Sequence, residues 1–340
     1  MGYLMKLGES YGAEVQLSRN NTYGNQILIV DGQGRSGKNL IAVLLSSLKN
    51  VEKMRLDSQI DYIPRYYFLG KMSQDAAITA LKTEFDEKYY YNWISRDVNF
   101  RFGDYTGVFK QANKFRYLKR LVMSADEKAS DKLKIKLPIF QEMTHDGLHV
   151  AKLYFKALGT TRLKMIHIFR DPIENIYEQH KRDFGTRIGN DPRELQLSFT
   201  FDNQPIPIIA IGYEKEYLSA NPIERLVLMV DIMFRRNVQG YLDLSPAEKE
   251  KILFIEFEEF VQSPNKDLQR IEAFLGQKFT KGSKRILKRE NCPRNLRRDE
   301  RYLKIQKIEN QLGPQYKQIL SQLLVDYDSK PWLKWKNSTY

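Results

Sequence analysis

Short apolar runs alternate along this chain with longer segments of helical spacing. The runs that predict strands lie at residues 27–31, 133–140, 164–169 and 252–257. The segments that predict helices lie at 38–49 and 149–159, and begin at Pro172, Pro222 and Asn265. Strands that alternate with helices predict an α/β fold, a three-layer sandwich in which helices flank a mostly parallel central sheet.

The chain of 340 residues is long enough to form one large domain. We expect a single α/β domain over 25–330, with an N-terminal extension over 1–24 and a C-terminal tail over 331–340. Residues 184–221 are rich in Gly, Pro and Asn and are predicted to form a loop-rich insertion in this domain.

The chain carries 55 Lys and Arg against 42 Asp and Glu, a formal net charge of +13. This excess favours an anionic partner: nucleic acid, a membrane surface, or a phosphorylated or sulfated small molecule.

A single cysteine, Cys292, excludes a disulfide framework and a cysteine-based zinc site. His145 and His149 are four residues apart, but the stretch HDGLH lacks the glutamate of a zinc helix, so no metal site is expected.

The first residues lack the apolar region of a signal peptide, and no apolar run approaches the roughly 18 residues of a membrane span. The sequence therefore predicts a soluble protein in the cytoplasm. No feature indicates an oligomeric state.

The stretch ILIVDGQGRSGKN, residues 27–39, joins a predicted strand to a predicted helix through a glycine-rich turn. Such a turn directs backbone N–H groups and a helix N-terminus at an anion, and Arg35 and Lys38 add positive charge. Gly32 and Gly37-Lys38 also have the Walker A spacing. Asn39 follows where that motif has a magnesium-binding Ser or Thr, which weakens an interpretation as a kinase or NTPase.

Three stretches, in order, resemble signatures of the sulfotransferase family, which has a P-loop NTPase-like fold. GQGRSGKNLIAVLLSSL resembles the loop that binds the 5′-phosphosulfate of the donor PAPS (3′-phosphoadenosine 5′-phosphosulfate). MIHIFRDPIENIYEQHKR resembles the strand that ends in Arg-Asp-Pro or Arg-Asn-Pro. ILFIEFEEFVQSPNKDLQRIEAFLGQKF resembles the late strand, its acidic turn and the helix that ends in Phe-Leu-Gly. The resemblance implies PAPS as donor and no metal.

The resemblance also implies roles for individual residues. Arg35 falls where the family has the Lys or Arg that stabilises charge on the leaving phosphate, and Arg170 falls on the arginine that binds the 3′-phosphate. The remaining residues that it places around the donor are Gly34, Ser36, Gly37, Lys38, Asn39, Lys281 and Gly282. Glu178 is a departure, because the family usually has a 3′-phosphate-binding serine there and a carboxylate repels phosphate.

A general base must take the proton of the acceptor. Cytosolic family members place a His for this in a Lys-Thr-His-Leu-Pro stretch, and aligning KIKLP with it puts Lys136 at the His position. Lys136 and His145 are therefore the first candidates for the catalytic base. Other branches use an acidic residue, and the acidic candidates are Glu142, Asp146, Asp97 and Asp104.

The sequence thus predicts a PAPS-dependent sulfotransferase that acts on a hydroxyl or amine of a small molecule or carbohydrate. The loop SRDVNFRFGDYT, residues 95–106, suits a polar acceptor such as a sugar, or packs on the core through its aromatic residues.

One alternative function is that of a P-loop phosphotransferase on the same scaffold. The other is a non-enzymatic anion or nucleic-acid binder, for which residues 281–301 hold nine basic and three acidic residues. Nucleic acid is disfavoured, because no recognition motif is present.

Overall fold

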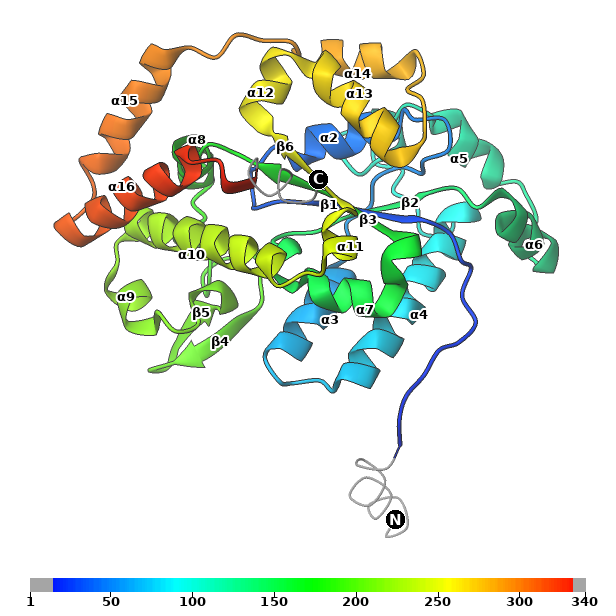
Figure 1. The fold of residues 1–340 in the computed structure, drawn as a ribbon, viewed down its shortest axis with the longest axis horizontal. Helices are drawn as coiled ribbons and strands as arrows, with labels where there is room; N and C mark the ends of the chain where they lie inside the picture. The colour runs from blue at the N-terminus through cyan, green and yellow to red at the C-terminus, as the bar shows by residue number, and fades with distance from the viewer. Residues whose placement is uncertain (1–14, 333–340) are drawn as a thin grey trace.

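A parallel sheet of four strands forms the centre of the protein, in a computed structural model that describes residues 15–332 (Figure 1). The strand order is β2-β1-β3-β6, and each neighbouring pair is parallel. These strands are β1 (Ile27–Asp31), β2 (Phe140–Met143), β3 (Leu163–Phe169) and β6 (Ile252–Glu256). All five residues of β1 are buried, which explains why it reads as one continuous apolar run.

Side chains of β1 alternate between two hydrophobic cores, one on each face of the sheet. Leu28 and Val30 pack with the helices drawn above the sheet in Figure 1, which are α2 (Lys38–Leu45), α12 (Phe257–Gln262), α13 (Pro264–Leu275) and α14 (Gly282–Arg289). Ile27 and Ile29 pack in the other core. The helices that contribute to it include α3 (Ser58–Phe68), α4 (Gln74–Trp93), α7 (Ala151–Arg162), α8 (Pro172–His180), α10 (Pro222–Leu242), α15 (Arg298–Glu309) and α16 (Pro314–Asp328). The predicted α/β sandwich with a parallel sheet is confirmed.

The remaining elements lie around this sandwich. Two helices follow α4 beyond the β2 edge, α5 (Lys114–Arg120) and α6 (Glu127–Lys136). The predicted insertion contains an antiparallel hairpin of β4 (Ser198–Phe201) and β5 (Gln204–Pro207), followed by α9 (Glu214–Ser219). The other short elements are α11 (Pro246–Lys249) and single 3₁₀ turns at Val108–Lys110, Leu148–Val150 and Ile208–Ala210. Across residues 15–332, no helix has the length and apolarity needed to cross a membrane.

The strand predicted over 133–140 is wrong in its first part, because α6 occupies 127–136 and β2 begins only at Phe140. Asp126 caps α6 by accepting a hydrogen bond from the Ala129 backbone N–H at 3.3 Å. Only Ala129 and Leu133 are buried on this helix, whereas Ile135 is 82% exposed. The alternation of lysine with apolar residues therefore does not mark a half-buried strand here.

The last residue of β1, Asp31, ties together the carboxyl ends of three strands. Its carboxylate accepts hydrogen bonds from Thr144 Oγ1 at 2.8 Å and from the backbone N–H groups of Gly147 (2.6 Å) and Leu148 (2.9 Å). The Nδ1 atom of His167 on β3 lies 2.7 Å from the same carboxylate. Burial alone would raise the pKa of Asp31, but His167 and these donors outweigh it and hold the pKa well below its usual range.

Asp31→Asn should destabilise the fold by about 3 kcal/mol, because the new NH₂ group faces two buried donors that then lose their acceptor. Urea unfolding followed by circular dichroism measures this loss. Asp131→Asn, at a side chain that is 66% exposed, is the matched control and should leave the unfolding midpoint unchanged. A loss below about 1 kcal/mol for Asp31→Asn would show that this cluster does not hold the strand ends together.

Candidate active site

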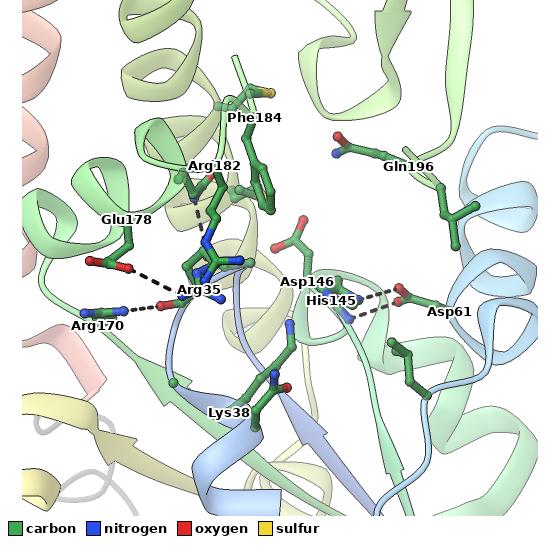
Figure 2. Close-up of a pocket in the computed structure, with 18 of the residues that line it drawn as sticks. Arg35, Lys38, Asp61, His145, Asp146, Arg170, Glu178, Arg182, Phe184 and Gln196 are labelled. Atoms are coloured by element: carbon green, nitrogen blue, oxygen red, sulfur yellow. Dashed lines mark hydrogen bonds and ion pairs between the residues drawn. The ribbon is translucent and has the colours of Figure 1, made fainter. Parts of the chain in front are cut away.

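One cavity of about 780 Å³ opens at the carboxyl edge of the sheet (Figure 2). A residue from the segment that follows each strand lines it: Lys38 after β1, His145 after β2, Arg170 after β3 and Phe257 after β6. In open parallel sheets, ligands bind outside the carboxyl ends of the strands. The cavity is therefore the candidate active site.

The glycine-rich turn between β1 and α2 forms the floor of the cavity. Gly37 has φ +89°, and a Cβ atom there would lie 2.1 Å from the Phe257 ring, so the turn requires glycine at this position. Asn175 on α8 holds the turn from the side by donating to the Gly34 carbonyl at 3.0 Å. Lys38 supports it from below by donating to the Gly32 carbonyl at 2.7 Å. Burial lowers the pKa of Lys38 to about 8, against the attraction of Asp31 and Asp61.

Three buried polar atoms around this turn have no hydrogen-bond partner among the described residues. They are Arg35 Nε, Ser36 Oγ and Arg170 Nε. Leaving such a group unpaired in a folded protein costs about 1–3 kcal/mol, and more for a charged group. An anion with several oxygen atoms would satisfy guanidinium donors of this kind.

Arg170 follows β3 and lies against Arg35 (Figure 2). Its guanidinium donates to the backbone carbonyl of Arg35 and stacks over the Phe257 ring at 5.0 Å. Glu174 and Glu258 lie 3.7 Å away on either side, too far for a strong hydrogen bond. Burial raises the pKa of Glu258 to about 7, against the attraction of Arg170. The positive charge of Arg170 is thus only partly balanced by Glu174 and Glu258, and its Nε atom has no hydrogen-bond partner among the described residues.

Glu178 is one of the residues that line the cavity, and it pairs with Arg35 at 3.4 Å and with Lys181 at 3.1 Å. Burial would raise the pKa of Glu178, but these two cations outweigh it and lower the pKa below its usual value. Glu178 is therefore ionised at neutral pH. A ligand anion that engages Arg35 has to compete with this carboxylate.

His145 lies on the opposite side of the cavity and is paired with Asp61 of α3 (Figure 2). The Nδ1 atom lies 3.3 Å from Asp61 Oδ2, and the His145 backbone N–H donates to Asp61 Oδ1 at 3.2 Å. Arg65, one helical turn after Asp61, donates to the His145 carbonyl. The imidazole is 41% exposed and faces the cavity. Such a histidine, oriented by a carboxylate, can act as a general base.

The insertion over 184–221 forms a further wall of the cavity. It contributes both charged and apolar side chains, which are Phe184, Arg187, Arg193, Glu194, Leu195, Gln196 and Ile209. Met229 and Met233 of α10 complete the apolar part of this wall. A wall of mixed polarity suits a small organic ligand.

The structure brings most of the predicted site residues together. Those that line the cavity are Gly34, Arg35, Gly37, Lys38, Asn39, His145, Asp146, Arg170 and Glu178. Ser36 lies behind the turn and lines a small adjoining pocket. The predicted residues outside the cavity lining are Asp97, Asp104, Lys136, Glu142, Lys281 and Gly282.

Lys136 is the last residue of α6, and its Nζ lies 5.7 Å from the centre of the Trp93 ring. Lys281 and Gly282 lie at the start of α14, where Gly282 packs near Ala112. Neither position has geometric support for a role at the cavity.

Sequence reasoning missed Asp61 and Arg65, which hold His145 from a helix far away in the sequence. A signal for the histidine was present, because Thr144-His145 directly follows a buried strand and matches the Thr-His order that was sought in KIKLP. Aligning on Lys-x-x-Leu-Pro instead of on Thr-His led to Lys136.

Comparison with known proteins identifies a sulfotransferase domain over residues 26–312 of the chain. The same comparison found no match among curated proteins. Among solved structures, a sulfotransferase domain from the curacin biosynthetic pathway has 13% identity and a TM-score of 0.44, with coverage of 78% of this chain and 77% of its own. Mouse sulfotransferase SULT7A1 complexed with PAP has 13% identity and a TM-score of 0.38, with coverage of 88% and 82%. The family assignment rests on the match to the domain model.

The pKa of His145 should lie below its ordinary value of 6.5, because burial, Lys38 and Arg65 lower it more than Asp61 raises it. Asp61→Asn removes the only opposing charge among these and should lower the pKa further. A pH titration of the imidazole signals by NMR measures both values, with His145→Gln to assign the resonance. A pKa that rises in Asp61→Asn would contradict the pairing described above.

Proposed function

The chain belongs to the sulfotransferase family, and we propose that it transfers a sulfuryl group from PAPS to a hydroxyl of a small-molecule or carbohydrate acceptor. The observation that supports this best is the set of unpartnered donors on Arg35, Ser36 and Arg170. Arg35 and Arg170 line the cavity at the end of the sheet, Ser36 lies behind the glycine-rich turn, and a histidine held by a carboxylate lines the same cavity.

The residues around the glycine-rich turn fit the two phosphate-bearing ends of such a donor. Arg35 and the N-terminus of α2 would hold the 5′ end of the donor. Lys38 stabilises the turn by donating to the Gly32 carbonyl. Arg170 would hold the 3′-phosphate through its spare donors. When bound, the donor supplies the sulfuryl group that is transferred. Glu178 is the one discordant residue and has to release Arg35 when the donor binds.

His145 would take the proton from the acceptor hydroxyl, because its imidazole faces the cavity and its lowered pKa keeps it neutral at pH 7. Asp61 orients the ring through Nδ1 and stabilises the imidazolium that forms. Arg35 lies across the cavity, where positive charge stabilises the developing charge on the leaving phosphate.

Arg170→Ala should weaken the binding of PAP, the desulfated donor, by roughly 50-fold, because a phosphate loses charge-assisted hydrogen bonds. The affinity for AMP, which lacks the 3′-phosphate, should change by less than about threefold. Isothermal titration calorimetry with both nucleotides measures this. Lys278→Ala removes an 84% exposed cation outside the cavity and is the control. An equal loss for PAP and AMP would contradict the assignment of Arg170 to the 3′-phosphate.

Glu178→Ser should bind PAP about tenfold more tightly than the wild type, since the substitution removes an ionised carboxylate that competes for Arg35. Glu178→Gln, which keeps the size of the side chain, should show most of the same gain. The same calorimetric titration detects it. Weaker binding in both variants would mean that Glu178 positions Arg35 for the donor instead of competing with it.

A further inference from the structure

Asp146 is a buried carboxylate in the cavity wall that neither the donor residues nor the base uses. It is only 5% exposed and lines the cavity beside His145. Its Oδ1 atom is covered from solvent and has no hydrogen-bond partner among the described residues. Figure 2 shows the carboxyl group directed into the open space of the cavity, on the His145 side.

The fold does not need this side chain to hold its own turn. Asp31 already fixes the turn by accepting from Thr144 and from the backbone of Gly147 and Leu148. Asp146 itself has a left-handed backbone with φ +57°, a conformation that Asp and Asn adopt more readily than most residues with a side chain.

The charges around Asp146 keep it ionised near neutral pH. Burial raises its pKa to about 6, while Arg65, Arg236 and a hydrogen bond from Asn237 oppose the rise. Arg65 also pairs with Asp61, and Arg236 donates to the carbonyls of Ile209 and Ile211, so both cations are engaged elsewhere. Asp146 is therefore a buried carboxylate, ionised at neutral pH, whose Oδ1 atom lacks a hydrogen-bond partner among the residues described.

We propose that Asp146 binds a second hydroxyl group of the acceptor, next to the hydroxyl that His145 deprotonates, so that the acceptor is a polyol of the sugar class. This inference rests on the proposed sulfuryl transfer and narrows its substrate. Because His145 and Asp146 are adjacent in the chain and line one cavity, their side chains engage groups that are close together on one molecule. A monohydroxyl alcohol would leave the carboxylate unpaired, and sites of this type reject such analogues strongly.

The test compares three small acceptors that differ in neighbouring hydroxyl groups: cyclohexanol, cis-1,2-cyclohexanediol and myo-inositol. Transfer from ³⁵S-labelled PAPS measures kcat/KM for each. The wild type should prefer the diol over cyclohexanol by at least about tenfold, as expected for a charged hydrogen bond. In Asp146→Asn this preference should fall to within about threefold, chiefly through a higher KM for the diol.

Asn is chosen because it tolerates the left-handed backbone as well as Asp does. Asp202→Asn is the matched control, since Asp202 also has a left-handed backbone (φ +48°) but lies outside the cavity lining. PAP binding and thermal unfolding of Asp146→Asn should match the wild type, which separates loss of the acceptor contact from misfolding.

Several results would overturn the inference. The first is that the wild type uses the diol and cyclohexanol equally well. The second is that the preference for the diol survives in Asp146→Asn. The third is that kcat falls equally for all acceptors in Asp146→Asn, which would make Asp146 a base. A protein that binds PAP but transfers to no diol or polyol would also overturn it. Failure to bind PAP at all would instead contradict the proposed sulfuryl transfer.

Discussion

The buried carboxylate of Asp31 is the constraint on which both sides of the cavity depend. It ends β1, directly before the glycine-rich turn, and it accepts hydrogen bonds from the 144–148 turn that carries His145 and Asp146. His167 of β3 completes the cluster. The glycine-rich turn and His145 are thereby fixed to the same strand end, so their separation is set by the sheet and not by flexible loops.

The charges around Arg35 and Arg170 are only partly balanced by neighbouring carboxylates. Two guanidinium groups, Arg35 and Arg170, lie together because Arg170 donates to the Arg35 carbonyl and because carboxylates surround the pair. None of the ion pairs between these groups is shorter than 3.4 Å, so they offset the repulsion without saturating the donors. These guanidinium groups therefore keep donor capacity for an anion, and under the proposed function a phosphate of the donor would displace Glu178 from Arg35.

Local patterns allowed much of the fold and the donor side to be predicted. The apolar run of β1 followed by glycines placed Arg35 and Lys38, and the strand that breaks at Arg-Asp-Pro placed Arg170. The base side depends on contacts that local patterns do not encode: Asp61 meets His145 across 84 residues of sequence. The strand predicted over 133–140 was wrong in its first part, because alternating Lys and apolar residues suit a strand or a helix, and the burial of Ala129 and Leu133 decides for the helix.

We propose above all that the end of this sheet holds a nucleotide with phosphates at both its 5′ and 3′ ends. The most direct measurement compares the calorimetric affinity of the wild type for PAP without metal and for ATP with Mg²⁺. We expect tight, magnesium-independent binding of PAP and much weaker binding of ATP. Tight binding of ATP–Mg²⁺ with no response to PAP would contradict it and would point to phosphoryl transfer on the same scaffold.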